Sequence, residues 1–132
     1  MTPRGLRNNN PGNIRRSEDN WRGLEEVQTD AAFFQFTELK WGIRALMRLL
    51  RTYRKKYRCN TITRIIQRYA PPSENNTKSY IMTVCDVMGV SPSYVPDLED
   101  MEDMCKLAQA ICFVENGVMI EDEEFIKAWE IL

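Results

Sequence analysis

The chain has 132 residues, 43% of them hydrophobic, with 18 basic and 19 acidic side chains and no histidine. This length and composition predict a single globular domain over residues 1–132 that is large enough for a real core. Without histidine, Ser-His and Cys-His triads and the usual catalytic zinc sites are excluded. Acid or base chemistry would fall to carboxylates, tyrosine or lysine, and we expect no metal and no cofactor.

The chain begins MTPRGLRNNN, where no apolar run follows the charges, and it has nowhere roughly 18 consecutive apolar residues. We therefore expect neither a signal peptide nor a membrane span, and a monomer made in the cytoplasm. Residues 1–13, rich in Asn, Pro and Gly, predict a loop with no regular element before Ile14. Between residues 14 and 37, short apolar pieces separated by polar turns predict a small β-region.

From residue 40 onward the pattern predicts five helices. The first runs from about Trp41 to Tyr57, with an apolar stripe at spacings of three and four. The next two are capped by Asn60 or Thr61 and by Asn76 or Thr77, and they stop at Ala70 and at Gly89. Asp100 caps the fourth, and the last begins at Asp122 with three side chains facing inward: Phe125, Ile126 and Trp129. The fold class is therefore α+β, predominantly α-helical.

Charge is divided unevenly along the chain. Residues 1–70 hold 15 Lys and Arg against 6 Asp and Glu, and residues 71–132 hold 3 against 13, so the halves carry +9 and −10 and should attract each other. Many of the arginines fall between residues 44 and 68, where they could form a phosphate-binding surface. However, Arg44, Arg48 and Arg51 recur at helical spacing opposite an apolar stripe, as on any solvated helix face. Nucleic-acid binding is the less favoured alternative.

The four cysteines have no CxxC spacing, and we interpret them as reduced thiols packed in the structure: Cys59, Cys85, Cys105 and Cys112.

Glu115 is the leading candidate for a catalytic residue. It stands on the last turn of the apolar helix KLAQAICFVENG, just before Asn116 and Gly117. Burial and the negative end of the helix dipole both favour the protonated form of a carboxyl group at such a place, which suits a general acid. The alternative is a solvated helix end whose C-cap is Asn116 or Gly117.

Tyr80 is the second candidate, in the segment SENNTKSYIMTV. It lies one turn inside its helix, so its hydroxyl could reach a carboxyl group or a substrate at the mouth of a cleft. The alternative is a core tyrosine with its hydroxyl at the surface.

These segments resemble the lysozyme-like superfamily of lytic transglycosylases and glucosaminidases. ENNTKSYIMTV is similar to the segment whose tyrosine supports a catalytic glutamate, and LAQAICFVENG to the helix that ends in that glutamate. RNNNPGNIR, NWRG and FFQF resemble the NN…GI, W.G and F..F arrangement of the phage-encoded relatives. The glutamate helix comes last here rather than first, which implies a circularly permuted lysozyme-like fold in which residues 9–13 follow spatially from the end of the Glu115 helix.

The resemblance implies cleavage of the β-1,4 bond between N-acetylmuramic acid and N-acetylglucosamine by Glu115 alone. Tyr80 would orient Glu115, and the other implied substrate contacts are Asn10, Asn13, Asn116 and Trp21, with Trp41 as a second aromatic platform. A hydrolase would need a second carboxylate, for which Glu18, Asp19 and Asp30 are the candidates.

The resemblance also implies a virion-associated phage or prophage protein, delivered to the cell wall, with peptidoglycan strands and other virion proteins as partners. A non-catalytic structural or murein-binding protein on the same scaffold is the competing hypothesis.

Overall fold

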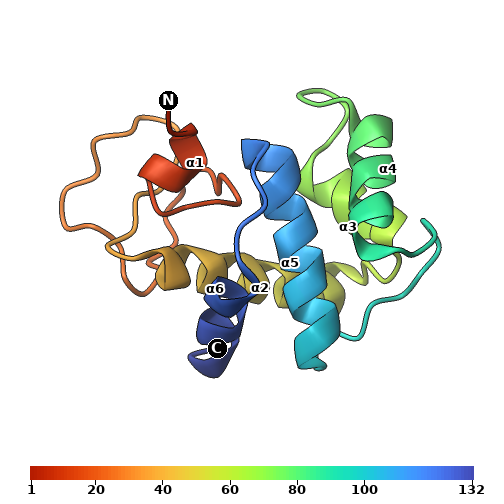
Figure 1. The fold of residues 1–132 in the computed structure, drawn as a ribbon. Helices are drawn as coiled ribbons and strands as arrows, with labels where there is room; N and C mark the ends of the chain where they lie inside the picture. Colours follow the sequence, from red (N-terminus) through yellow and green to blue (C-terminus); the bar gives the residue numbers. More distant parts are fainter.

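The computed structural model describes residues 1–132 and is predominantly helical. Its helices are α1 (Arg4–Arg7), α2 (Leu39–Tyr57), α3 (Ile62–Tyr69), α4 (Thr77–Met88), α5 (Met101–Asn116) and α6 (Asp122–Glu130). Figure 1 shows α5 at the centre, with α3 and α4 on one side, α1 and α6 on the other, and α2 crossing behind it. In agreement, α5 contacts α1, α2, α4 and α6. None of these helices combines the length and the apolar character that crossing a membrane requires.

The predicted apolar stripe of α2 is confirmed. Four of its side chains are fully buried, and each stabilises the fold by roughly 1.5–3 kcal/mol: Ile43, Leu46, Met47 and Leu50. α2 is therefore a packing platform for the other helices.

The predicted helix boundaries are also confirmed where capping residues set them. Thr61, Asn76 and Asp100 each accept a hydrogen bond on the side chain from the backbone N–H three residues on. Gly89 and Gly117 end α4 and α5 with φ of 71° and 70°, which a residue with a Cβ adopts only under strain.

Two expectations about the ends of the chain are wrong. Residues 4–7 form a short helix behind Pro3, whose fixed φ suits a helix start, so the N-terminal segment is not all loop. In α6, Phe125 is buried but Ile126 is 38% exposed, because α6 packs on α2 and α5 through the neighbouring face of the helix.

The predicted β-region is much smaller than expected. It consists of two isolated bridges, Arg15 with Phe33 and Leu24 with Phe36. Side chains take the place of a partner strand: Gln28 Oε1 accepts from the backbone N–H of Gln35, and Gln35 Oε1 accepts from those of residues 29 and 30. With these backbone groups satisfied, no continuous ladder is needed.

Asp30 holds the N-terminal segment to this irregular region. Its carboxylate accepts hydrogen bonds from Arg4 Nε at 2.7 Å, Arg4 Nη2 at 2.6 Å and Asn8 Nδ2 at 3.0 Å. It also accepts from the backbone N–H groups of residues 32 and 33. These hydrogen bonds hold the pKa of Asp30 well below its usual range, and the bond from Arg4 has the largest effect.

Gly42 lets the N-terminal loop reach α2. A Cβ at this position would lie 1.8 Å from the carbonyl oxygen of Asn9, which is backbone and cannot swing away. Only a glycine therefore permits residues 9 and 10 to pack against the first turns of α2.

The two halves of opposite charge meet through ion pairs between Arg15 and Glu74, at 3.6 Å, and between Arg51 and Glu99, at 3.2 Å. The expected attraction between the halves is thus realised locally, through one exposed pair and one in which Arg51 is partly buried, and surface pairs of this kind contribute little.

Gly42→Ala should lower the free energy of unfolding by about 3 kcal/mol, because the added methyl group displaces the Asn9 backbone. Urea unfolding followed by circular dichroism measures this change. Lys55→Ala, on the exposed face of the same helix, is the control and should change stability by less than about 0.5 kcal/mol. Equal stability of both variants would mean that the loop does not pack on Gly42.

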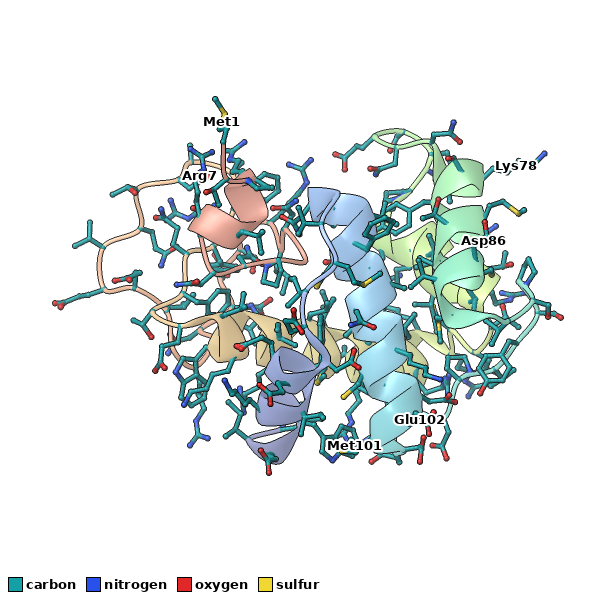
Figure 2. All side chains as sticks on the ribbon, viewed as in Figure 1. Met1, Arg7, Lys78, Asp86, Met101 and Glu102 are labelled. Atoms are coloured by element: carbon teal, nitrogen blue, oxygen red, sulfur yellow. The ribbon has the colours of Figure 1, made fainter.

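Asp30→Asn should lower the melting temperature at neutral pH. As pH falls, the melting temperature of this variant should decrease less than that of the wild type. Because the folded-state pKa of Asp30 is depressed, its contribution is present above the unfolded pKa of about 4 and is lost as pH falls below it. Thermal melts between about pH 7 and pH 2 test this. Asp86→Asn, an exposed acid on the outer side of α4 (Figure 2), should reproduce the wild-type profile.

Candidate active site

A cleft of about 460 Å³ lies where the N-terminal loop, α2, α3 and the end of α5 meet. Its walls combine aromatic, charged and amide side chains, including Asn13, Arg15, Asp19, Trp21, Phe33, Tyr53, Arg68, Tyr69, Glu74, Asn75 and Glu115. Aromatic faces beside a few convergent polar groups are typical of a binding site for a small organic ligand.

Glu115 stands in this cleft, half-buried on the last turn of α5. Tyr80 donates its hydroxyl proton to Oε2 at 2.8 Å, and Asn13 donates from Nδ2 to Oε1 at 2.9 Å. The three residues come from α4, α5 and the N-terminal loop, so only the folded chain brings them together. The two bonds fix the plane and the rotamer of the carboxyl group.

Tyr80 is 5% exposed and reaches Glu115 from inside the molecule. Burial raises its pKa far above the usual range, and the neighbouring Tyr69 and Glu115 raise it further. Tyr80 is therefore a permanent hydrogen-bond donor to Glu115 and not a base. Cys112, one turn before Glu115, is a buried thiol whose pKa is raised by burial, so no thiolate competes in this region.

The loop that carries Asn13 is held on both sides. Asn116 donates from Nδ2 to the carbonyl of Pro11 at 2.7 Å, and Tyr69 donates its hydroxyl to the carbonyl of Gly12. Asn13 itself has φ of 50°, a left-handed conformation that asparagine tolerates better than most residues. The loop thus presents the Asn13 amide to Glu115 in one orientation.

The other predicted substrate contacts are distributed differently. Asn10 is 0% exposed, and its amide bonds to Ile14 and to the carbonyl of Phe34, so it has no free group to offer a sugar. Trp21 lines the cleft, with its Nε1 buried and without a hydrogen-bond partner. Trp41 does not line the cleft. Its ring lies against Gly23, where an added Cβ would overlap the ring.

Of the predicted second carboxylates, Asp19 lines the cleft and Glu18 does not. Asp30 does not line the cleft either, and its carboxylate accepts hydrogen bonds from Arg4 and Asn8. Glu74, in the loop before α4, was not foreseen from the sequence and also lines the cleft.

Tyr69 and Arg68 also line the cleft, a position that the sequence did not indicate, although Arg68 belongs to the arginine-rich stretch considered as a phosphate-binding surface. Both stand on the last turn of α3, immediately before the Ala-Pro-Pro stop. An aromatic and a basic residue at the end of this helix could have indicated a binding site. The spacing of apolar residues in α3 does not show, however, that the helix faces the N-terminal loop.

A second recess continues on the other side of Glu115. It measures about 300 Å³ and is lined by Asn75, Asn76, Ser79, Tyr80, Thr83, Val114 and Glu115. Glu115 and Asn75 line both hollows, so an extended ligand could pass across the Glu115 carboxyl group.

The arginine cluster of α2 is largely occupied within the protein. Arg44 is 7% exposed and donates to the carbonyl of Ile131, whereas Arg54 donates to the carbonyls of residues 59, 60 and 96. These contacts tie α2 to neighbouring segments.

The arrangement can present an oriented carboxyl group to a ligand with hydroxyl and ether oxygens. A carboxyl group fixed by two donors and placed between two hollows has the geometry that general acid–base catalysis requires at a bond lying across it.

No protein-family model matches the chain. The chain is 40% identical over 113 residues to protein P5 of Pseudoalteromonas phage PM2, an alignment that covers 76% of this chain and 71% of that protein. The name of the relative states no activity, so it supports an association with phage and leaves the chemistry to the geometry.

Tyr80→Phe should lower the free energy of unfolding by about 1–2 kcal/mol, because it leaves Glu115 Oε2 without its buried donor. Chemical denaturation measures the loss. Tyr94→Phe is a matched control, since Tyr94 donates to the carboxylate of Asp103 at 2.6 Å outside the cleft. Both variants should remain folded. An unchanged stability of Tyr80→Phe would contradict the bond to Glu115.

Proposed function

The chain belongs to the family of protein P5 of Pseudoalteromonas phage PM2, and we propose that it is a peptidoglycan-cleaving glycosidase of the lytic transglycosylase or muramidase type. It is associated with phage, and we place its action at the cell wall that a phage must open.

The observation that carries this proposal is the Glu115 carboxyl group held between Tyr80 and Asn13 at the junction of two hollows. The contact between Glu115 and Tyr80 is the one that the resemblance to lysozyme-like transglycosylases implied. In the proposal, Asn13 orients Glu115 from the opposite side, and Trp21 offers an aromatic face in the cleft for a sugar ring.

A permuted lysozyme-like order is part of the proposal. It is supported by the position of the loop of residues 9–13, which lies at the end of α5 through the bonds of Asn13 to Glu115 and of Asn116 to Pro11. These are the contacts expected if the loop follows the glutamate helix in space although it precedes it in the chain.

The proposed reaction needs one carboxyl group. Glu115 in its acid form gives its proton to the glycosidic oxygen as the bond from muramic acid C1 to that oxygen breaks. The resulting carboxylate then takes the proton of the muramic acid 6-hydroxyl, whose oxygen bonds to C1 and closes a 1,6-anhydro ring. In a hydrolase the attacking oxygen would come from water, with Asp19 or Glu74 as the second carboxylate.

A non-catalytic murein-binding or virion structural protein is the second candidate. It is favoured by the fact that both oxygens of Glu115 are already bonded within the protein, as they would be in a purely structural carboxylate. This alternative predicts binding to murein without any product.

Glu115→Gln should lower the cleavage of purified murein by at least about 100-fold, because the amide of Gln cannot give or take the proton that the proposed reaction moves. Release of dye from labelled murein measures the rate. The control is Glu102→Gln, at the opposite end of the same helix (Figure 2), which should keep the wild-type rate.

Tyr80→Phe should slow cleavage while Tyr94→Phe leaves it unchanged, since only Tyr80 bonds to Glu115. A Glu115→Gln protein with the wild-type rate would overturn the proposal. Tight binding to murein without release of dye by the wild-type protein would favour the non-catalytic candidate.

A further inference from the structure

Arg68 is a cation in the wall of the cleft whose charge has no acidic partner. It stands on the last turn of α3, makes no ion pair, and lines the same hollow as Glu115. The other cation of the cleft wall, Arg15, lies 3.6 Å from Glu74. Arg68 is therefore the cation of this cleft that is free to meet a negative charge from outside.

Two tyrosines hold the guanidinium group of Arg68 in place. Its central carbon lies 3.2 Å from the centre of the Tyr57 ring and 5.4 Å from that of Tyr53. Such contacts restrict a side chain that would otherwise lose much rotamer entropy on binding. These contacts engage no acidic group, so the charge of Arg68 remains available.

The chemistry of this arrangement selects an anion with planar geometry. A guanidinium edge matches a carboxylate through two parallel hydrogen bonds. A neutral N-acetyl sugar has no group that requires a full positive charge, so binding of sugar rings alone does not account for an unpaired arginine at this place.

We propose that Arg68 binds a carboxylate of the glycan substrate, and that it makes the cleft selective for murein over uncharged chitin-like glycans. This inference rests on the proposed function, since it specifies the substrate of the same cleft. In intact murein the carboxylates lie on the peptide stems. In strands stripped of peptide, the lactyl group of muramic acid carries a free carboxylate instead.

A purely structural Arg68 would differ in a measurable way. If its only role were to cover the rings of Tyr53 and Tyr57, its loss would weaken every ligand equally or none at all. A carboxylate-binding Arg68 matters only for ligands that carry the charge.

The test is equilibrium binding to the Glu115→Gln protein, which keeps the ligand intact, with and without Arg68→Gln. The probes are soluble murein strands with peptide stems, the same strands after amidase treatment, and a hexamer of N-acetylglucosamine. Arg64→Gln, an exposed arginine one turn earlier on α3 and outside the cleft, is the matched control. Thermal melts check that each variant is folded.

Arg68→Gln should weaken binding of a carboxylate-bearing probe by about fivefold and leave the uncharged hexamer unchanged. Arg64→Gln should not change the affinity for any probe. Arg68→Lys should restore part of the affinity, because lysine keeps the positive charge but cannot form two parallel hydrogen bonds. The murein probe that responds identifies the carboxylate, on the stem or on the lactyl group.

Equal weakening for all three probes, no weakening for any, or no binding of either murein probe by the parent protein would each overturn the inference. Cleavage of murein by the wild-type chain is scored separately. If the wild type releases product and the Arg68→Gln variant binds charged strands normally, the proposed function stands. Arg68 then has no role in substrate binding.

Discussion

The loop of residues 9–13 is held against the end of α5 by bonds from both sides, and the candidate site depends on this contact. Asn116 binds the carbonyl of Pro11, Tyr69 binds that of Gly12, and the loop in turn places the Asn13 amide on Glu115. Because Asn13 and Glu115 are 102 positions apart in the chain, no local structure can produce their meeting. The packing of the N-terminal segment on the helical core is thus a condition for the chemistry proposed for Glu115.

Several residues outside the cleft wall stabilise this one contact. Asp30 fixes α1 through Arg4 and Asn8, and Gly42 admits the Asn9 backbone to the surface of α2. Buried Asn10 closes the loop on itself. The site is therefore supported by polar bonds of an irregular segment, and its geometry should be more sensitive to changes in that segment than the helical core is.

The helices were largely predictable from the sequence, and the site was predictable in part. Periodicity and capping residues such as Thr61 and Asp100 act locally, so α2 to α5 begin and end close to where the pattern puts them. The motif resemblance indicated Glu115 and Tyr80, but it assigned Asn10 to substrate, where burial places it in the loop interior. The β-region was overestimated because side-chain bonds from Gln28 and Gln35 satisfy the backbone without a ladder. Neither pattern nor motif reveals which helix end faces the loop, so the positions of Tyr69 and Arg68 in the cleft wall were not predicted.

In the proposed mechanism, Glu115 acts as acid and base on a glycosidic bond without a second carboxylate. Mass spectrometry of the soluble products from purified murein incubated with the wild-type chain tests it most directly. Fragments that end in 1,6-anhydromuramic acid are the expected products, since the 6-hydroxyl attacks the anomeric carbon. Products with ordinary reducing ends would contradict the one-carboxylate chemistry and point to Asp19 or Glu74, and the absence of any product from a folded protein bound to murein would contradict the enzymatic assignment as a whole.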